Sequence, residues 1–167
     1  VRAERILAIV GKNSNHISDV IKGFSTKVEI NEQSEQLGTG HAVLCAKNHF
    51  KGQTGDLLIL YGDCPLISEE SIKKMLHLRE AGVDLAVLGF DSKNPKSYGR
   101  LKLDSTGALE KIIEANDATA EEQTITFCNS GVMIADANLF FSLLDKVSNK
   151  NTAKEFYLTD LVTLAKK

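Results

Sequence analysis

The sequence of 167 residues contains no tryptophan, only two prolines and only three cysteines. The cysteines form no Cys-x-x-Cys pair, which disfavours a zinc site or a disulfide framework and fits reduced thiols in the cytoplasm. No apolar run approaches the roughly 20 residues that span a bilayer, and the first residues show no signal-peptide pattern. The net charge of −2 excludes a broad attraction to nucleic acid or to an anionic membrane. We therefore expect a cytoplasmic protein with neither nucleic acid nor membrane as a partner.

What is present is the composition of a globular domain. Hydrophobic residues make up 43% of the chain and charged residues 25%, enough for a packed core. No repeat, low-complexity tract or linker divides the sequence, so residues 1–167 are expected to form a single domain. The chain has no initiator methionine and opens almost directly in an apolar run, which we interpret as the sign of a fragment.

Apolar runs and amphipathic segments alternate along the first half of the chain. A strand at Arg5–Gly11, a helix ending near Phe24 and a strand at Lys27–Ile30 predict a β-α-β unit. Further strands are expected at residues 57–61, 83–90, 98–104, 109–114 and 125–135. Further helices are expected at residues 40–50, from Ser68 onward, at residues 136–147 and from Thr159 onward. The pattern predicts an α/β fold with a Rossmann-like, mostly parallel sheet and an antiparallel hairpin.

The most informative stretch is Leu57–Asp63, in which five apolar or aromatic residues precede Gly62 and Asp63. A run this short and this apolar predicts a strand buried on both faces at the centre of a parallel sheet. Asp63 then lies at the carboxyl end of the strand, where open α/β sheets bind their ligands. One carboxylate with phosphates and water is a typical arrangement for Mg²⁺. The alternative is an aspartate that only caps the next turn, and aspartate is common there.

The polar residues near this strand say less. Gly38-Thr39-Gly40 before a helix offers backbone N–H groups to an anion, but glycines often precede helices for turn reasons alone. His41 is interpreted as a surface residue. Cys64 is interpreted as a loop filler, because the neighbouring carboxylate raises the pKa of a thiol. The residues by themselves predict a domain that binds a phosphate-bearing ligand with Mg²⁺ at Asp63, and they do not name the ligand.

Six motifs occur in order over nearly the whole chain. They are Gln33–Ala42, Leu60–Ile67, Ser97–Arg100, Ile113–Ala118, Asn129–Gly131 and Glu155–Asp160. Together they closely resemble the uridyltransferase domain of the bacterial bifunctional N-acetylglucosamine-1-phosphate uridyltransferase/glucosamine-1-phosphate acetyltransferases. No single motif is decisive, because sugar nucleotidyltransferases in general share a Gly-Asp pair after a central strand.

The resemblance implies that a uridyl group passes from UTP to N-acetylglucosamine 1-phosphate, giving UDP-N-acetylglucosamine and pyrophosphate, with Mg²⁺ as the cofactor. It also implies a set of substrate-binding residues. These are Gln33, Gly38 and Thr39 for uracil, Tyr61, Gly62 and Asp63 for nucleotide and sugar, Gly99, Glu114 and Asn129 for the amino sugar, and Tyr157 and Thr159 near the acetamido pocket. Asp63 is in addition the implied Mg²⁺ ligand.

The sequence also departs from the family pattern in ways that bear on catalysis. The family's first strand and its glycine-rich signature loop, which cradles the triphosphate, are absent from residues 1–167, so we expect no catalytic residue among them. The resemblance also implies a second metal ligand, an asparagine, and an acetyltransferase domain beyond the last residue. We therefore expect negligible turnover by these residues alone, because single charge-stabilising groups are worth roughly 10²–10³ in rate.

Three questions stay open at this point. The chain is either part of a uridyltransferase or a non-catalytic module that binds a nucleotide sugar. A nucleotidyltransferase with another base specificity, such as a guanylyl or thymidylyl transferase, is a further alternative. A homo-oligomer is compatible with the sequence, which does not decide the oligomeric state.

Overall fold

The computed structural model describes residues 2–25 and 27–166. They form a mixed α/β fold, as expected from the sequence, and divide into two compact units. The first unit comprises Val1–Gln53 and Ser148–Leu158, and the second comprises Thr54–Val147 and Thr159–Lys167. That residues 1–167 form a single domain remains a prediction, which this division into compact units does not test. Within the described residues, no helix has the length and apolar character that crossing a membrane requires.

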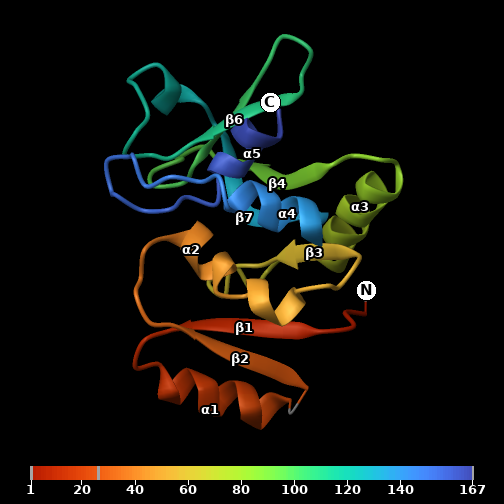
Figure 1. Ribbon diagram of the computed structural model, residues 1–167. Helices are drawn as coiled ribbons and strands as arrows, with labels where there is room; N and C mark the ends of the chain where they lie inside the picture. Colours follow the sequence, from red (N-terminus) through yellow and green to blue (C-terminus); the bar gives the residue numbers. More distant parts are fainter. Residues whose placement is uncertain (1, 26, 167) are drawn as a thin grey trace. The chain divides into compact units, whose positions relative to one another are not determined.

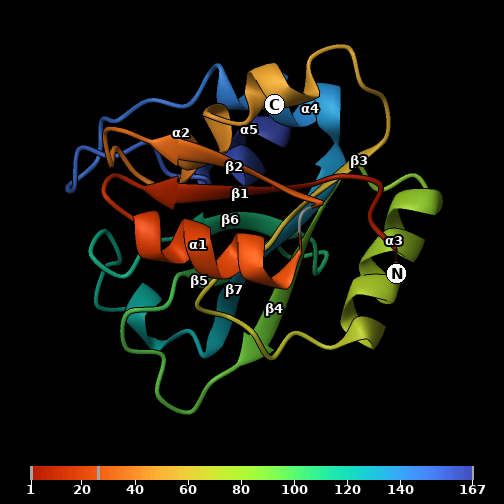
Figure 2. The ribbon, with the colours of Figure 1, turned by 90° about the horizontal axis from the view of Figure 1, so that it is seen from below.

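The first unit contains two parallel strands and the helix that connects them. β1 (Ile6–Gly11) pairs in parallel with β2 (Val28–Gln33) along its whole length. α1 (Asn15–Phe24) lies against one face of this pair (Figure 1, Figure 2). The β-α-β unit is therefore confirmed. β2 continues three residues beyond the predicted Ile30, because its polar second half pairs with β1 although it lacks an apolar pattern, and Gln33 is its last residue.

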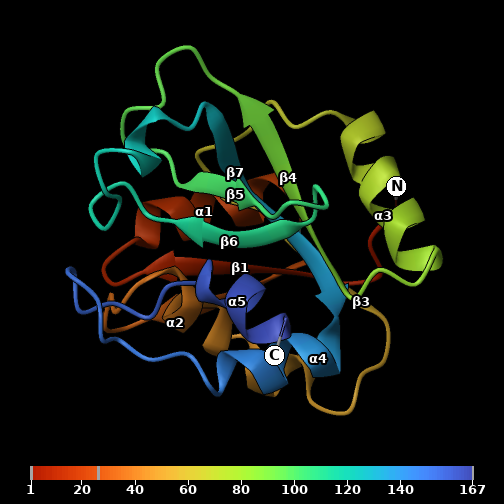
Figure 3. The same ribbon diagram turned by 90° about the horizontal axis from the view of Figure 1, so that it is seen from above.

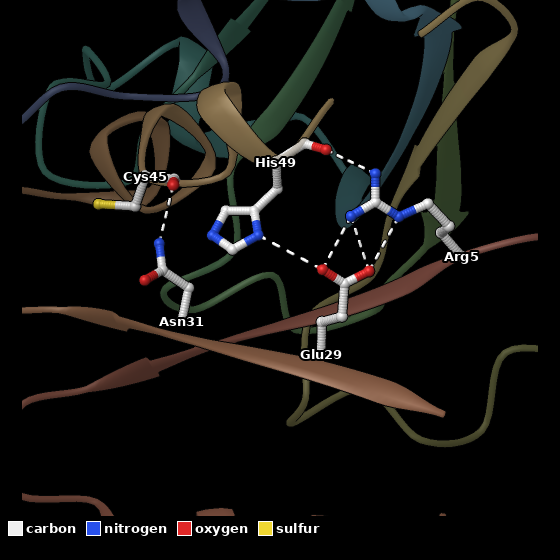
Figure 4. A network of polar contacts seen from close by, with 5 residues as sticks. All are labelled: Arg5, Glu29, Asn31, Cys45 and His49. Atoms are coloured by element: carbon white, nitrogen blue, oxygen red, sulfur yellow. Dashed lines mark hydrogen bonds and ion pairs between the residues drawn. The ribbon is translucent and has the colours of Figure 1, made fainter. Parts of the chain in front are cut away.

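One face of β2 holds the segment that follows it. That segment is α2 (Thr39–Leu44) and the 3₁₀ turn η1 (Lys47–Phe50), not the single helix expected at residues 40–50. Side chains two positions apart on a strand point to the same side, which places Glu29, Asn31 and Gln33 together. Asn31 Nδ2 donates to the carbonyl oxygen of Cys45 at 2.8 Å (Figure 4).

Glu29 is the centre of a second attachment on the same face. Arg5 Nη2 donates to both carboxylate oxygens of Glu29, at 2.7 and 2.8 Å, and Arg5 Nη1 donates to the carbonyl oxygen of His49 (Figure 4). The ring of His49 lies 3.5 Å from the same carboxylate. The hydrogen bonds from Arg5 hold the pKa of Glu29 below its ordinary value. These contacts join Arg5, directly before β1, to β2 and η1.

The second unit is built around β7 (Phe127–Asp136), the longest of the described strands. β4 (Leu85–Asp91) pairs with β7 along most of its length, and β3 (Asp56–Ile59) pairs with its second half. β5 (Arg100–Leu103) meets the first half of β7 and forms the expected hairpin with β6 (Leu109–Ile113) (Figure 3). All of these pairings are antiparallel.

The expected parallel arrangement around residues 57–61 is therefore wrong in its pairing. β3 and β4 both pair with Met133 and Ala135 of β7, so they lie on opposite edges of β7 and run in the same direction. The alternation of strand and helix indicates the common direction of β3 and β4 but not the insertion of a later strand between them. β3 ends at Ile59, and Leu60 is 52% exposed, so this run is not buried on both faces throughout.

The helices of the second unit begin where the sequence signals place them. α3 (Glu69–Glu80) is capped by Ser68, whose Oγ accepts a hydrogen bond from the N–H of Ser71 at 3.1 Å. α4 (Ala137–Leu144) is capped by Asp136, whose carboxylate accepts from two backbone N–H groups. α5 (Asp160–Ala165) follows Thr159.

The core of the second unit lies where α3 meets the sheet. Met75 of α3 is 2% exposed and packs with Ala86 of β4 and with Val132 and Ile134 of β7. Full burial of such side chains contributes about 1.5–3 kcal/mol each to the free energy of folding. β7 is therefore packed into the core of this unit.

Glu122 of the 3₁₀ turn η2 (Glu122–Thr124) holds the loop that follows β6. Its carboxylate accepts hydrogen bonds from the backbone N–H of Thr119 and from Lys111 Nζ, both at 3.0 Å. These bonds, the backbone bond first, lower the pKa of Glu122 from 4.5 to about 2. Because the unfolded chain then binds the additional proton, the contribution of Glu122 to stability is present at neutral pH and lost as the pH falls from 4.5 toward 2.

Replacing Glu122 by glutamine is expected to flatten the loss of stability below pH 4.5, because glutamine cannot be protonated in this range. Thermal unfolding followed by circular dichroism between pH 7 and pH 3 measures this slope. The neighbouring Glu121→Gln is the matched control and should keep the slope of the unsubstituted chain, since Glu121 is exposed. An equal slope in Glu122→Gln and the unsubstituted chain would contradict the expectation.

Candidate functional site

The first group of predicted site residues lies in the first unit, at the carboxyl end of β2. Gln33 is 9% exposed, and its Nε2 donates to the carbonyl oxygen of Gly38 at 3.1 Å. The same nitrogen lies 2.9 Å from Nδ1 of His41. Because a carbonyl oxygen only accepts, the amide of Gln33 is oriented with Nε2 toward Gly38, and Oε1 is directed away from that carbonyl group. The interpretation of His41 as a surface residue is wrong, since its half-buried ring helps to hold Gln33.

Gly38 has a backbone conformation that only glycine adopts at low cost. Its φ of 103° and ψ of 175° lie in the region that is essentially closed to other residues. A Cβ at Gly38 would also lie 2.8 Å from Cβ of Glu155 and 2.8 Å from the carbonyl oxygen of Phe156. Glycine at this position is therefore required by both the conformation and the space.

The Gly38 loop is clamped to a segment more than a hundred residues later in the chain. The N–H of Phe156 donates to the carbonyl oxygen of Leu37 at 2.8 Å, and the N–H of Gly40 donates to the carbonyl oxygen of Phe156 at 2.7 Å. Thr39 Oγ1 accepts a hydrogen bond from the N–H of Leu158 at 3.1 Å. Backbone bonds on both sides of Gly38 thus fix the position of the loop within the first unit.

The second group lies in the second unit and centres on Glu114. Thr159 is 2% exposed, and its Oγ1 donates to Glu114 Oε1 at 2.8 Å across 45 positions of sequence. A Cβ at Gly99 would lie 3.6 Å from Cβ of Asn129 and 3.7 Å from Glu114 Oε2. The carbonyl oxygen of Gly99 accepts from the N–H of Asn129 at 2.8 Å. The fold therefore gathers these four residues from the start of β5, the end of β6, the first half of β7 and the start of α5.

Thr159 departs from its expected local role. The sequence predicts that it caps the last helix, but its side chain makes no hydrogen bond to the first turn of α5. The hydroxyl instead donates to Glu114 and so restrains that carboxylate. The helix-cap pattern correctly places Thr159 at the start of α5. It does not predict the hydrogen bond to Glu114, because Glu114 is distant in sequence.

Arg100 is a residue near this group that the sequence patterns did not single out. It is 4% exposed, and its Nη1 donates to the carbonyl oxygen of Lys96 at 2.9 Å and to that of Tyr98. These bonds close the loop directly before Gly99. Its position in the Ser97–Arg100 motif could have identified Arg100 as a residue near the site.

Tyr61 and Asp63 occupy the turn after β3. The turn is closed by the hydrogen bond from the N–H of Cys64 to the carbonyl oxygen of Tyr61 at 3.1 Å. Asp63 is exposed, and its carboxylate accepts from Cys64 Sγ at 3.6 Å. Burial and the charge of Asp63 raise the pKa of the Cys64 thiol, which fits its interpretation as a loop filler.

The chemistry of this turn bears on the implied Mg²⁺. Among the described residues, no group of three or more His, Cys, Asp or Glu side chains could hold a metal ion. Mg²⁺ commonly binds through one or two carboxylates together with phosphate oxygens and water. The exposed carboxylate of Asp63 fits that mode of binding.

The predicted site residues are thus divided between the units. Gln33, Gly38, Thr39 and Tyr157 belong to the first unit, whereas Tyr61, Gly62, Asp63, Gly99, Glu114, Asn129 and Thr159 belong to the second. Tyr157 is half-buried between Phe156 and Leu158, which form the clamp. Each group is ordered by hydrogen bonds within its own unit.

Residues 2–131 match the model of the MobA-like NTP transferase domain family. The bifunctional protein GlmU of Ruegeria sp. (strain TM1040) is 43% identical over 163 residues, which are 98% of this chain and 36% of that protein. The GlmU of Bartonella quintana (strain Toulouse) is 40% identical over 163 residues, with the same coverage. The chain thus spans about a third of the length of these relatives, and the resemblance indicated by the motifs is confirmed.

Solved structures show the same fold. A crystal structure of UDP-glucose pyrophosphorylase complexed with UDP-glucose has a TM-score of 0.67 and 15% identity, and covers 96% of this chain and 69% of that chain. The apo form of UDP-glucose pyrophosphorylase has a TM-score of 0.67 and 15% identity, with 97% and 69% covered. At this identity the likeness concerns the fold alone.

Proposed function

Because this chain belongs to the MobA-like NTP transferase domain family, we propose that it forms part of a cytoplasmic sugar nucleotidyltransferase. The proposed reaction is uridyl transfer. A phosphate oxygen of N-acetylglucosamine 1-phosphate forms a bond to the α-phosphorus of UTP, and the bond from that phosphorus to the departing pyrophosphate breaks. The products are UDP-N-acetylglucosamine and pyrophosphate. The similarity to GlmU proteins supports sugar nucleotidyl transfer, and the six motifs of the sequence suggest these substrates.

The observation that carries the proposal is the group around Glu114. A buried threonine hydroxyl orients its carboxylate, and Gly99 places no side chain beside it. A sugar presents hydroxyl and amide N–H groups, and carboxylate and backbone oxygens are their natural acceptors. Asn129 adds an amide beside Gly99. We propose that Gly99, Glu114, Asn129 and Thr159 bind the amino sugar.

The base would be bound by the first unit. The fixed amide of Gln33 presents an acceptor, and uracil carries one ring N–H donor between two carbonyl oxygens. Gly38 and Thr39 bring backbone groups beside it without a bulky side chain at Gly38. We propose that these three residues bind uracil, with Tyr157 adjacent in the clamp that holds their loop.

Asp63 would hold Mg²⁺, with Tyr61 and Gly62 beside the nucleotide and the sugar. When bound, Mg²⁺ supplies charge neutralisation to the phosphates, which phosphoryl transfer requires more than a protein nucleophile. The residues of this chain bind and orient the two substrates. We propose that the chain turns over negligibly by itself, because no glycine-rich signature loop occurs in residues 1–167.

Calorimetric titration of the purified chain with several nucleotide sugars in the presence of Mg²⁺ tests this function. UDP-N-acetylglucosamine is expected to bind roughly tenfold or more tightly than a GDP-sugar or a dTDP-sugar, which corresponds to about 1.4 kcal/mol or more. Glu114→Gln should weaken UDP-N-acetylglucosamine binding and leave the binding of UDP unchanged, because UDP lacks the sugar.

The alternatives differ in their results in this titration and in an assay of pyrophosphate release. Tighter binding of the GDP-sugar or dTDP-sugar would show that the chain is specific for a base other than uracil. If none of these compounds binds, the proposal that the chain has a nucleotide-sugar site is wrong. Release of pyrophosphate from UTP and N-acetylglucosamine 1-phosphate at ordinary enzyme rates would contradict the need for the signature loop.

A further inference from the structure

β7 contains a bulge opposite β4. The register between the two strands, which run side by side in Figure 3, shifts between Val87 and Gly89. Within the bulge, Ser130 Oγ donates to the carbonyl oxygen of Leu88 at 2.7 Å, and Gly131 has a φ of +81°. Bulges bend a strand locally and redirect its side chains. The Asn129–Gly131 motif is therefore a departure from regular strand geometry that several bonds hold in place.

The first consequence of the bulge concerns Tyr61. A Cβ at Gly131 would lie 2.6, 2.7 and 3.0 Å from Cδ2, Cε2 and Cγ of the Tyr61 ring. These distances are far below van der Waals contact, so the ring occupies the space that any side chain at Gly131 would need. The flat ring of Tyr61 rests directly on the backbone of the bulge.

The second consequence concerns Asn129. The N–H of Gly131 donates to Oδ1 of Asn129 at 3.0 Å, in a buried environment. An N–H can only donate, so the oxygen of the amide is on the Gly131 side and its orientation is fixed. Asn129 therefore presents its Nδ2 group, which has two donors, to its other neighbours. A ligand at this position has to offer an acceptor.

We propose that Gly131 is a positioning residue for the sugar-nucleotide site. Its missing side chain seats the ring of Tyr61, and its N–H turns the Asn129 amide so that Nδ2 donates to an oxygen of the bound sugar, such as a hydroxyl or an acetamido carbonyl. The proposal rests on the proposed function. It adds that Asn129 is the hydrogen-bond donor, and the sugar the acceptor, in their contact. Gly131 itself need not touch the ligand.

A glycine with positive φ is often required by a turn alone, and the chain contains a matched example. Gly107 in the β5–β6 hairpin has a φ of +83°, and nothing lies within 4 Å of its Cβ position. Gly107→Ala measures the backbone strain without a clash. Any larger effect of Gly131→Ala then comes from the contacts of Gly131.

The contact with Tyr61 is tested by thermal unfolding of a double-mutant cycle. Gly131→Ala is expected to lower the melting temperature by about 3–10 °C more than Gly107→Ala, because the methyl group overpacks against the ring. In a Tyr61→Ala background this additional loss should disappear, because the ring is gone. The double variant is expected to fold even if Gly131→Ala alone does not, because the overpacking is removed. An equal loss from Gly131→Ala in the unsubstituted chain and in the Tyr61→Ala background would overturn the proposed contact.

The positioning role is tested by calorimetric titration with UDP-N-acetylglucosamine and with UDP. A purely structural defect lowers both affinities equally, because it only reduces the folded fraction. Displacement of Tyr61 and Asn129 should instead lower the affinity for UDP-N-acetylglucosamine roughly tenfold more than that for UDP, about 1.4 kcal/mol. Gly107→Ala should leave the ratio of the two affinities unchanged.

Asn129→Asp separates the two contacts of Gly131. Aspartate keeps an oxygen for the N–H of Gly131 but has no N–H donor, so the chain should stay folded and lose the preference for UDP-N-acetylglucosamine over UDP. An unchanged ratio of affinities in both Gly131→Ala and Asn129→Asp would overturn the positioning role. If the unsubstituted chain binds neither compound, the proposed function fails, whereas the stability cycle still reports on the contact between Gly131 and Tyr61.

Discussion

Gly38→Ala is expected to abolish measurable uridine-nucleotide binding and to destabilise the first unit. Alanine at the φ and ψ of Gly38 costs about 1–3 kcal/mol in backbone strain. The new methyl group would also meet a backbone carbonyl oxygen at 2.8 Å, and overpacking against groups that cannot rotate away costs roughly 1–3 kcal/mol more. Relief requires the loop to leave the Glu155–Leu158 segment, which breaks the bonds on both sides of Gly38.

The measurement combines thermal unfolding with titration of UDP. A loss of about 3 kcal/mol corresponds to a melting temperature lowered by roughly 6–12 °C for a chain of this size. Gly52→Ala is the matched control in the same unit, because Gly52 has a φ of +75° and nothing within 4 Å of its Cβ position. It should cost only the backbone strain and leave nucleotide binding intact. Equal effects of the two substitutions would show that the clamp does not depend on Gly38.

Asp63→Asn is expected to remove the Mg²⁺ dependence of nucleotide-sugar binding. The substitution keeps the shape of the side chain and deletes the negative charge, which is what draws a hard divalent cation to an exposed turn. We expect the gain in UDP-N-acetylglucosamine affinity on adding Mg²⁺ to fall by roughly tenfold or more, about 1.4 kcal/mol or more. Stability should change little, because Asp63 is exposed and accepts a single weak hydrogen bond from Cys64.

Calorimetric titration with and without Mg²⁺ measures this gain in both proteins. Asp84→Asn is the matched control, since Asp84 is an exposed aspartate in the turn before β4. It should keep the Mg²⁺ dependence of the unsubstituted chain. Unchanged dependence in Asp63→Asn would refute the assignment of Asp63 as the metal ligand.

Local features of the fold could be predicted from short stretches of sequence. The β-α-β unit, the β5–β6 hairpin and the cap of α3 by Ser68 each depend on residues close together in the chain. Periodicity and turn chemistry act over such distances, and tertiary contacts do not oppose them here. The end of β2 was missed because Asn31-Glu32-Gln33 has no apolar pattern and is held by pairing with β1.

The candidate site was predicted as a set of residues, but its contacts were not. Motif order identifies Gln33, Glu114 and Thr159, yet it does not indicate that Thr159 donates to Glu114. It likewise gives no sign that the ring of His41 contacts the amide of Gln33. Hydrogen-bond partners of this kind depend on where separate elements meet, which no local pattern records.

Sequence by itself determined the fold class, most of the elements and the positions of the motifs at their ends. These follow from the spacing of apolar residues and from the conformational preferences of glycine, proline and capping side chains. Only the tertiary structure decided that β7 lies between β3 and β4, that the Gly38 loop is clamped by residues 155–158, and that Gly131 seats Tyr61. Such pairings depend on how all the apolar surfaces and backbone groups are satisfied together, so they are properties of the whole chain.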